Sequence, residues 1–212
     1  MSGNPVIGLV MATLLEAAPF IEDLSLPERE AEPFRLYEGD RIALIVSGIG
    51  KANAALACAC LIQTRRPVLV CNLGAAGATD GRCALGECYH ISRVVEPDRP
   101  HLRSGLPHEH LPDVLDGLPL AVLATQDRPL REPAERESAA VHAPLADMEG
   151  AAVVQACRRF GLKCFLFKFV SDTPGRRTNA EIVRNIELYR DAHFRFFNDL
   201  VLPRLPFLAG ER

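Results

Sequence analysis

The sequence predicts an α/β protein with three layers, because short apolar runs alternate with helical patterns along the chain. Two of these runs, residues 5–11 and 164–170, are apolar almost throughout, which is typical of strands buried on both faces of a sheet. In folds of this class, ligands bind beyond the carboxyl ends of the strands. We therefore expect functional side chains where the predicted strands end.

The remaining elements follow the same alternation. The predicted strands comprise, in chain order, residues 5–11, 34–37, 41–46, 67–71, 88–95, 119–125 and 164–170. Helices are expected over residues 12–21, from 52 to about 64, from the acidic pair around Met148 to Phe160, and over 179–202, where Pro203 ends the last one. Residues 24–33 and 96–115 are predicted loops, and residues 128–137, with alternating Arg and Glu, are predicted to form an exposed loop or a short helix.

Two helices show the spacing of a buried face. In the helix before the last predicted strand the apolar residues with this spacing are Val153, Ala156, Cys157 and Phe160. Gly161 follows directly, where a left-handed helix stop favours glycine. The expected apolar face of the C-terminal helix comprises Ile182, Ile186, Tyr189, Phe196 or Phe197, and Leu200.

Composition and charge exclude several classes of protein. The chain has 212 residues, 48% of them hydrophobic, and we expect a single folded domain over residues 1–212. A net charge of −3 without basic clusters argues against a nucleic-acid surface, and no apolar run is long enough to span a membrane. No positive segment precedes the first apolar run, so no signal peptide is expected. The seven cysteines lie mostly in apolar runs, as reduced thiols of a cytoplasmic protein do.

Five segments carry polar or small residues at predicted strand ends or helix starts. They are Glu16, Ser47–Lys51, Gly74–Gly77, Glu149 and Ser171–Asp172. Each also has an ordinary structural interpretation: an acid at a helix N-terminus, a tight turn, a close approach of two strands, or an Asp that begins a turn. The turn at 47–51 lacks the Walker A and dinucleotide-binding patterns and is a weak signal by itself. Four of the segments are expected at strand ends and Glu149 is the fifth, and this convergence outweighs any one motif and predicts a site.

One histidine-rich segment is a weaker candidate. The predicted loop 96–115 contains His108, Glu109 and His110. Two loop histidines without a third ligand are more often surface residues than a metal site. We therefore expect neither a metal nor a cofactor.

The order of five motifs carries a family resemblance. They are Gly8-Leu9-Val10 with Glu16, Ser47-Gly48-Ile49-Gly50-Lys51, Asn72-Leu73-Gly74-Ala75-Ala76-Gly77, Met148-Glu149-Gly150-Ala151-Ala152, and Ser171-Asp172. In this order they resemble the purine nucleoside phosphorylase/nucleosidase superfamily, above all its methylthioadenosine/S-adenosylhomocysteine nucleosidase branch. The resemblance covers nearly the whole chain and is vague between about residues 96 and 145. It implies a mixed, partly barrel-like central sheet within the three layers, and a homodimer.

The resemblance also implies a reaction, the cleavage of the N-glycosidic bond of a purine ribonucleoside through an oxocarbenium-like sugar. Asp172 is then the general acid that protonates N7 of the purine, and Glu16 orients and deprotonates the attacking water. Glu149 holds the ribose hydroxyls, and Met148 packs on the sugar. The other implied substrate-binding residues are Ser171, Ala75, Ala76, Gly77, Ser47 and Gly48.

Hydrolysis of an adenine nucleoside such as methylthioadenosine or S-adenosylhomocysteine is the expected activity. The segment from Gly8 to Glu16 contains no arginine to hold phosphate, and an acid there would repel it, so phosphorolysis is disfavoured. Asp rather than Asn at position 172 suits a 6-amino purine better than a 6-oxo purine.

Three departures from the family pattern keep alternatives open. Ala75 replaces a Ser, Pro129-Leu130 falls where an aromatic residue stacks on the purine, and Lys168 replaces an Arg before the Ser-Asp pair. The alternatives are a futalosine-type hydrolase, an adenosylhopane nucleosidase or phosphorylase, and a non-catalytic nucleoside-binding protein.

Overall fold

The structure, a computed structural model, describes residues 6–175 and 178–206, and their strands form one ten-stranded mixed sheet. The strands are β1 Ile7–Met11, β2 Glu28–Glu30, β3 Arg35–Glu38, β4 Ile42–Val46, β5 Leu69–Ala78, β6 Cys88–Pro100, β7 Pro107–His110, β8 Leu120–Thr125, β9 Leu145–Asp147 and β10 Lys163–Asp172. The helices are α1 Leu14–Asp23, α2 Lys51–Arg65, α3 Pro133–Ala140, α4 Gly150–Arg159 and α5 Asn179–Arg195, which continues as a π-helical segment, Phe196–Val201, and a 3₁₀ turn, Leu202–Arg204.

Part of the sheet closes on itself. β10 pairs with β6, β6 with β8, β8 with β9, β9 with β5, and β5 pairs back with β10. Beyond β5 the sheet opens into β1, β4, β3 and β2. The expected mixed, partly barrel-like sheet is confirmed, because parallel pairs such as β1–β5 and antiparallel pairs such as β5–β9 share one sheet.

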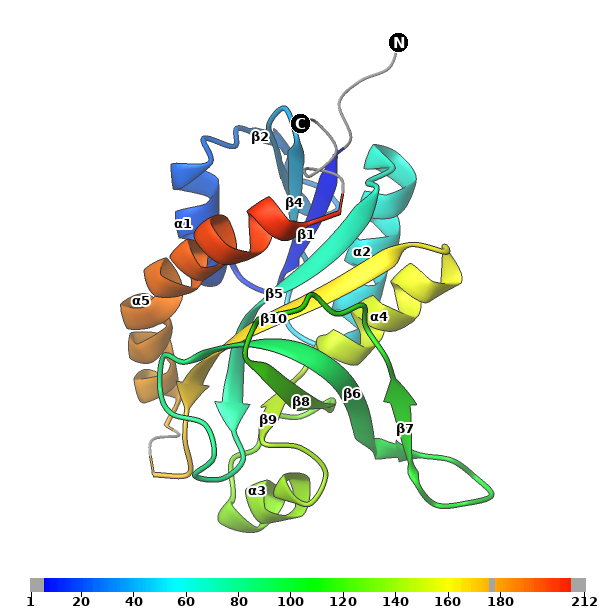
Figure 1. Cartoon of the computed structure of the whole chain (residues 1–212), viewed down its shortest axis with the longest axis vertical. Coiled ribbons are helices and arrows are strands. Elements are labelled where there is room, and N and C mark those ends of the chain that lie inside the picture. The colour runs from blue at the N-terminus through cyan, green and yellow to red at the C-terminus, as the bar shows by residue number, and fades with distance from the viewer. Residues whose placement is uncertain (1–5, 176–177, 207–212) are drawn as a thin grey trace.

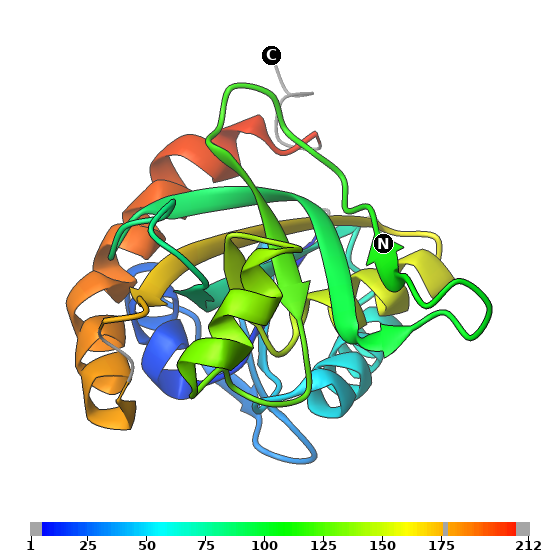
Figure 2. The ribbon, with the colours of Figure 1, turned by 90° about the horizontal axis from the view of Figure 1, so that it is seen from below.

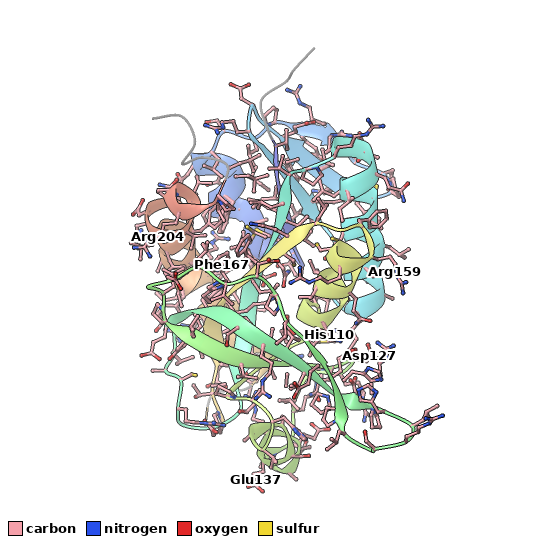
Figure 3. The ribbon with its side chains drawn as sticks, turned by 45° about the vertical axis from the view of Figure 1, so that its right-hand side comes forward. His110, Asp127, Glu137, Arg159, Phe167 and Arg204 are labelled. Atoms are coloured by element: carbon pink, nitrogen blue, oxygen red, sulfur yellow. The ribbon has the colours of Figure 1, made fainter. Side chains whose placement is uncertain are left out.

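Helices cover both faces of the open part of the sheet. In Figure 1, α1 and α5 lie on one side, and α2 and α4 lie on the other. Each pair encloses a core of its own: Phe20 and Phe197 are fully buried in the first, and Leu61 and Val153 in the second. Phe167 of β10 lies inside the fold, whereas Glu137 of α3 points outward (Figure 3). The three-layer prediction is confirmed.

The helix that precedes β10 matches its predicted pattern except at its last residue. Val153 and Cys157 are fully buried, but Phe160 is 43% exposed because it lies at the C-cap of α4. Gly161 has φ +70°, as expected of a left-handed stop. In the C-terminal helix Ile186 and Phe197 are buried as expected, whereas Leu200 is 44% exposed, since the π-helical turn rotates it away from the core.

Three strands, β5, β6 and β10, are longer than the sequence predicts. β5 runs through the small-residue segment 74–77 because β10 pairs along that segment and β9 pairs with its end. The predicted loop 96–115 contains the end of β6 and all of β7, which form a hairpin. The predicted loop 24–33 contains the short strand β2. The first predicted strand starts at Pro5, which lies outside the described residues.

No helix of the described residues is long and apolar enough to cross a membrane. All seven cysteines lie within the described residues and are free thiols, four of them buried in strands or helices of the core: Cys58, Cys71, Cys157 and Cys164.

Candidate active site

A cavity of about 190 Å³ lies where β5 and β10 end, next to the start of α1 and the turn before α4. Figure 2 shows α3 in front of this end of the barrel. The predicted site residues that line the cavity are Glu16, Ala75, Ala76, Gly77, Met148, Glu149, Ser171 and Asp172. The structure thus brings together side chains from both halves of the chain.

Ser47 and Gly48 do not line the cavity. The Ser47 hydroxyl is buried and donates to the Gly48 carbonyl at 2.8 Å. The Gly48 N–H donates to the Ala12 carbonyl, so these groups of the turn are already hydrogen-bonded within the protein. The turn reaches the site through Gly50 instead, whose backbone N–H donates to Glu149 Oε1 at 2.8 Å.

Glu16 is held at both carboxylate oxygens. It is the third residue of α1 and forms a capping box with Thr13, whose hydroxyl donates to Glu16 Oε2 at 2.6 Å. The other oxygen, Oε1, accepts from the Ala75 backbone N–H at 2.8 Å. A Cβ at Gly74, where φ is +149°, would lie 2.8 Å from Glu16 Oε1. The glycine therefore leaves the space that the carboxylate occupies.

Asp172 is also held at both oxygens. The Ser171 hydroxyl donates to Oδ1 at 2.8 Å, and Arg136 Nη2 forms an ion pair with Oδ2. A Cβ at Gly77 would come within 2.8 Å of Oδ2, so this carboxylate too approaches a glycine closely. The Ser171 carbonyl accepts from Asn185 of α5, which fixes the end of β10.

Glu149 is 7% exposed and lies directly before α4. Burial raises the pKa of Glu149 to about 7, and the negative charge of the neighbouring Asp147 contributes to this rise. The positive charge of Lys168 and the hydrogen bond from Gly50 act in the opposite direction. A carboxyl group with such a pKa changes charge near neutral pH, which is typical of functional sites.

Asp147 and Lys168 form a buried ion pair beneath the cavity. Lys168 Nζ lies 2.9 Å from Asp147 Oδ2, and both side chains are 1% exposed. Asp147 also accepts from the Thr125 hydroxyl at 2.6 Å and from the Gly150 N–H at 2.8 Å. Burial would lower the pKa of Lys168, but the charges of Asp147 and Glu149 outweigh burial and raise it. The pair thus anchors the start of α4, and with it Glu149.

Arg136 is the main residue that the sequence analysis missed. Residues 128–137 were expected to be exposed, yet Arg136 is 3% exposed and lines the cavity from α3. Its alternating charged neighbours, such as Glu135 and Glu137, are exposed as predicted. No pattern in the sequence distinguishes Arg136 from them, because only the fold turns this position inward. The prediction was wrong for Arg136.

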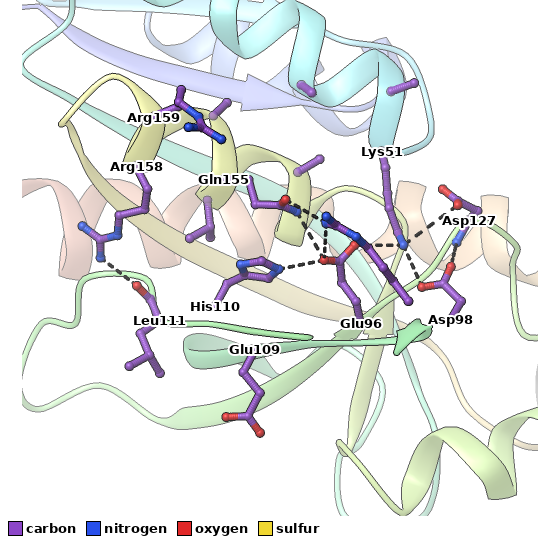
Figure 4. A pocket seen from close by; sticks show the side chains of 16 residues that line it. Lys51, Glu96, Asp98, Glu109, His110, Leu111, Asp127, Gln155, Arg158 and Arg159 are labelled. Carbon is purple, nitrogen blue, oxygen red and sulfur yellow. Dashed lines mark hydrogen bonds and ion pairs between the residues drawn. The ribbon is translucent and has the colours of Figure 1, made fainter. Parts of the chain in front are cut away.

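A second, larger hollow of about 1370 Å³ lies between α2, α4 and the β6–β7 hairpin (Figure 4). Lys51 Nζ lies 3.1 Å from Glu96 and 2.7 Å from Asp98, and His110 Nε2 lies 2.7 Å from Glu96. Burial would raise the pKa of Glu96, but hydrogen bonds from His110 and Lys51 outweigh burial and lower it to about 2. Lys51, Glu96, Asp98 and His110 thus pair with one another in this hollow.

Metal ligands do not gather in the part of the chain that the structure describes, where no three His, Cys, Asp or Glu side chains could hold one ion. His110 is engaged with Glu96, and the ring of His108 lies against His101.

The comparisons with known proteins agree with this geometry. The family model described as the phosphorylase superfamily matches residues 6–114 and 116–201. A 5'-methylthioadenosine/S-adenosylhomocysteine nucleosidase from Geobacillus sp. (strain WCH70) is 28% identical over 193 residues, which cover 77% of this chain and 80% of the relative. The sequence predicts an enzyme of the nucleosidase type, and this relative is named as one.

Two solved structures share the fold. The apo form of Arabidopsis thaliana 5'-methylthioadenosine nucleosidase has a TM-score of 0.85 at 22% identity, over 99% of this chain and 98% of that one. The futalosine hydrolase of Helicobacter pylori strain 26695 has a TM-score of 0.81 at 19% identity, over 93% of this chain and 97% of that one. Both structures share the fold of this chain, and their names give different substrates for those two proteins. The family match spans almost all described residues, and the chain belongs to the phosphorylase superfamily.

Proposed function

We propose that this protein is a purine nucleosidase that hydrolyses the N-ribosyl bond of an adenine nucleoside such as methylthioadenosine or S-adenosylhomocysteine. The observation that carries the proposal is the convergence of three carboxyl groups, Glu16, Glu149 and Asp172, on one cavity. Hydrolysis of an N-glycosidic bond needs an acid for the leaving group and a base for water. It also needs a group that holds the sugar between them.

In the proposed mechanism Asp172 donates a proton to N7 of the purine, and Ser171 orients it through the bond to Oδ1. Glu16 positions the attacking water and accepts its proton, while the Ala75 N–H and Thr13 fix its orientation. Glu149 binds the ribose hydroxyls, and Met148 packs beside the sugar. The purine lies along the small residues Ala75, Ala76 and Gly77 of β5.

Hydrolysis is proposed over phosphorolysis because the two buried cations of the site are already paired. Lys168 is paired with Asp147, and Arg136 with Asp172. Glu16 adds a negative charge where phosphate would have to attack.

The place of the protein in the cell is part of the same proposal. Seven free cysteines, five of them buried in the core, suit a reducing compartment, and we propose the cytoplasm. A homodimer is proposed from the family resemblance, and the exposed apolar side chains Ile49 and Leu56 near α2 offer a surface for pairing. Sedimentation at two protein concentrations tests this assembly.

A base-release assay tests the activity. The purified protein is incubated with methylthioadenosine, S-adenosylhomocysteine, adenosine, inosine and futalosine, each with and without phosphate, and free base is separated by chromatography. Phosphate-independent release of adenine that Asp172→Asn abolishes supports the proposal. Release only with phosphate contradicts the role of Glu16. Binding of nucleosides without release of any base identifies a non-catalytic binding protein.

A futalosine-type substrate is the second candidate, and one observation favours it. None of the described residues that line the cavity is aromatic, and Pro129 and Leu130 line the place where an aromatic side chain was expected. The stacking on the purine that the resemblance implies for a methylthioadenosine/S-adenosylhomocysteine nucleosidase is therefore missing among the described residues of the cavity.

A further inference from the structure

The hairpin of β6 and β7 projects from the body of the protein and carries apolar side chains at its end. Figures 1 and 2 show the connection between the two strands as a loop that extends beyond the neighbouring elements. We call residues 101–106, which join β6 to β7, the hairpin tip. Leu102 of the tip is fully exposed, and Leu106 is 65% exposed.

The hairpin tip is a closed turn that holds these two leucines outward. The His101 N–H donates to the Leu106 carbonyl at 2.8 Å, and the Gly105 N–H donates to the His101 carbonyl at 2.9 Å. Gly105 has φ +68°, a left-handed conformation that favours glycine. Because the backbone of the turn is already ordered, a partner that covers the leucines need not first fix the loop.

The apolar surface of the hairpin tip continues onto the end of α3. Val141 follows α3 directly and is 81% exposed. Leu106, Pro107 and Val141 line one hollow of about 620 Å³. Exposed apolar side chains that gather in one place, rather than singly, mark a site of interaction.

The charge of this part of the hairpin is positive. Residues 99–108 contain two arginines and two histidines and no acidic residue, although the whole chain has a net charge of −3. Arg99 turns back toward Glu96, which lies 3.2 Å from it. Arg103 is exposed and has no ion-pair partner among the described residues. The tip thus presents an unpaired cation between two exposed leucines.

We propose that the hairpin tip binds the surface of a lipid bilayer that contains anionic lipids. Leu102 and Leu106 enter the boundary between headgroups and acyl chains, and Arg103 stays at the level of the phosphates. Reversible binding to a bilayer surface combines these two contributions, buried apolar area and attraction of cations to anionic lipids. The contact lies outside the cavity at the ends of β5 and β10 and does not depend on the proposed function.

The composition of the hairpin tip favours a bilayer over other partners. A single-stranded nucleic acid offers phosphates, but its bases stack on aromatic side chains, and residues 99–108 contain no Phe, Tyr or Trp. A symmetric contact between the tips of two copies would place Arg103 against its own counterpart, and like charges repel. An anionic bilayer offers both a partner for Arg103 and an apolar interior for the leucines.

Co-sedimentation with vesicles tests the contact. The purified protein is mixed with vesicles of phosphatidylcholine alone and with vesicles of an equal mixture of phosphatidylcholine and phosphatidylglycerol. We expect it to pellet with the mixed vesicles and to remain largely in solution with the neutral ones. Because salt screens exposed charges, added sodium chloride should release it. Protein that remains in solution with both kinds of vesicle overturns the proposal.

Substitutions in the hairpin tip show which side chains carry the contact. Leu102→Ser and Leu106→Ser remove apolar area from the bilayer, and each is expected to weaken binding about tenfold. Arg103→Gln is expected to weaken binding to the mixed vesicles about fivefold. Leu188→Ser is the matched control, since Leu188 of α5 is 64% exposed and lies on the far side from the hairpin (Figure 1).

Thermal unfolding checks that all these variants fold. Leu188→Ser is expected to bind as the wild-type protein does. The proposal is overturned if the variants of Leu102, Leu106 and Arg103 bind the mixed vesicles as tightly as Leu188→Ser does.

Fluorescence shows whether the tip itself enters the bilayer. The chain contains no tryptophan, so Leu102→Trp introduces its sole indole ring. With the mixed vesicles its emission is expected to shift to shorter wavelength and to be quenched by lipids with brominated acyl chains. Leu188→Trp is expected to show neither effect. If Leu102→Trp pellets with the vesicles and its emission does not change, the contact lies elsewhere and the proposal is overturned.

Sedimentation velocity without lipid separates a membrane contact from a contact between subunits. The hairpin tip is expected to be free in solution, so Leu102→Ser and Leu106→Ser should keep the oligomeric state of the wild-type protein. If the wild-type protein is a dimer and these variants are monomers, a second copy covers the tip, and the proposal is overturned.

Discussion

The carboxylate of Glu16 accepts a hydrogen bond from the backbone N–H of Ala75 at 2.8 Å, which joins α1 to the middle of the barrel wall. The same carboxylate caps α1 through Thr13. A side chain that serves a helix cap and also faces a cavity has little freedom to turn away. The structural and the functional interpretations of Glu16 are therefore compatible.

Replacement of Glu16 by glutamine separates its two roles. The amide is of similar shape and can still accept from the Ala75 N–H, so the fold is expected to tolerate it. It cannot take a proton from water, and we expect kcat to fall by about 10²–10⁴-fold. Steady-state kinetics with the best substrate measure this loss, and thermal unfolding reports on the helix cap. A kcat within threefold of wild type, on the order of experimental scatter in such comparisons, would show that Glu16 is only a capping residue.

Replacement of Gly74 by alanine tests whether the glycine makes room for Glu16. The added Cβ would lie 2.8 Å from Glu16 Oε1 at a backbone φ of +149°. We expect a loss of about 1–3 kcal/mol in the free energy of unfolding and a fall in kcat of about 10²-fold, because the carboxylate must shift. Gly81→Ala is the control, since nothing lies within 4 Å of its Cβ position. Equal behaviour of the two variants would contradict this account.

The sequence predicts most of the fold because its signals are local. Apolar runs mark β1, β8 and β10, and Gly161 marks the end of α4. Asp172 and Glu149 stand at strand and helix ends, but their convergence depends on the pairing, since β10 runs parallel to β5 whereas β9, which precedes Glu149, runs antiparallel to it. The length of β5 does not follow, because glycine-rich strands form only where neighbouring strands supply the hydrogen bonds.

The burial of Arg136 could not be predicted from local sequence patterns. Its neighbours alternate in charge and are exposed, so the segment is expected to face solvent. The side chain turns inward because it forms an ion pair with Asp172, 36 residues further along the chain, and this pair offsets the cost of burying its charge. Lys51 is a similar case: its three acidic neighbours, Glu96 and Asp98 of β6 and Asp127 after β8, are distant in the sequence. Long-range ion pairs of this kind have no sequence pattern.

Removal of Lys168 tests the ion pair that anchors the site. Lys168→Met leaves Asp147 buried without its cation, and we expect a loss of about 3–5 kcal/mol in the free energy of unfolding. Lys163→Met, at the exposed start of the same strand, is expected to change stability little. The double variant Lys168→Met with Asp147→Asn should recover part of the loss, because the remaining charge is removed. Denaturant unfolding measures these three variants and the single variant Asp147→Asn, and losses of the two single variants that simply add in the double variant would contradict the pairing.

The raised pKa of Glu149 predicts how the activity depends on pH. Its pKa is raised to about 7, and the ribose hydroxyls are best held by the ionised carboxylate. We therefore expect kcat/KM to rise with pH with a midpoint near 7. Glu149→Gln should have a lower kcat/KM and should lack this rise. A wild-type profile that is flat through neutral pH would contradict the assignment.

The raised pKa of Glu149 also predicts how the stability of the protein without substrate changes with pH. Between the ordinary value of 4.5 and about 7, the folded state holds a proton on Glu149 that the unfolded state has lost. Stability therefore decreases as pH rises through this window, and Glu149→Gln, which cannot ionise, should not show this contribution. Denaturant unfolding of both proteins below pH 4.5 and above pH 7 gives the difference. If the wild-type protein gains stability relative to Glu149→Gln as pH rises, the folded carboxylate is better stabilised than the free one, and burial does not control Glu149.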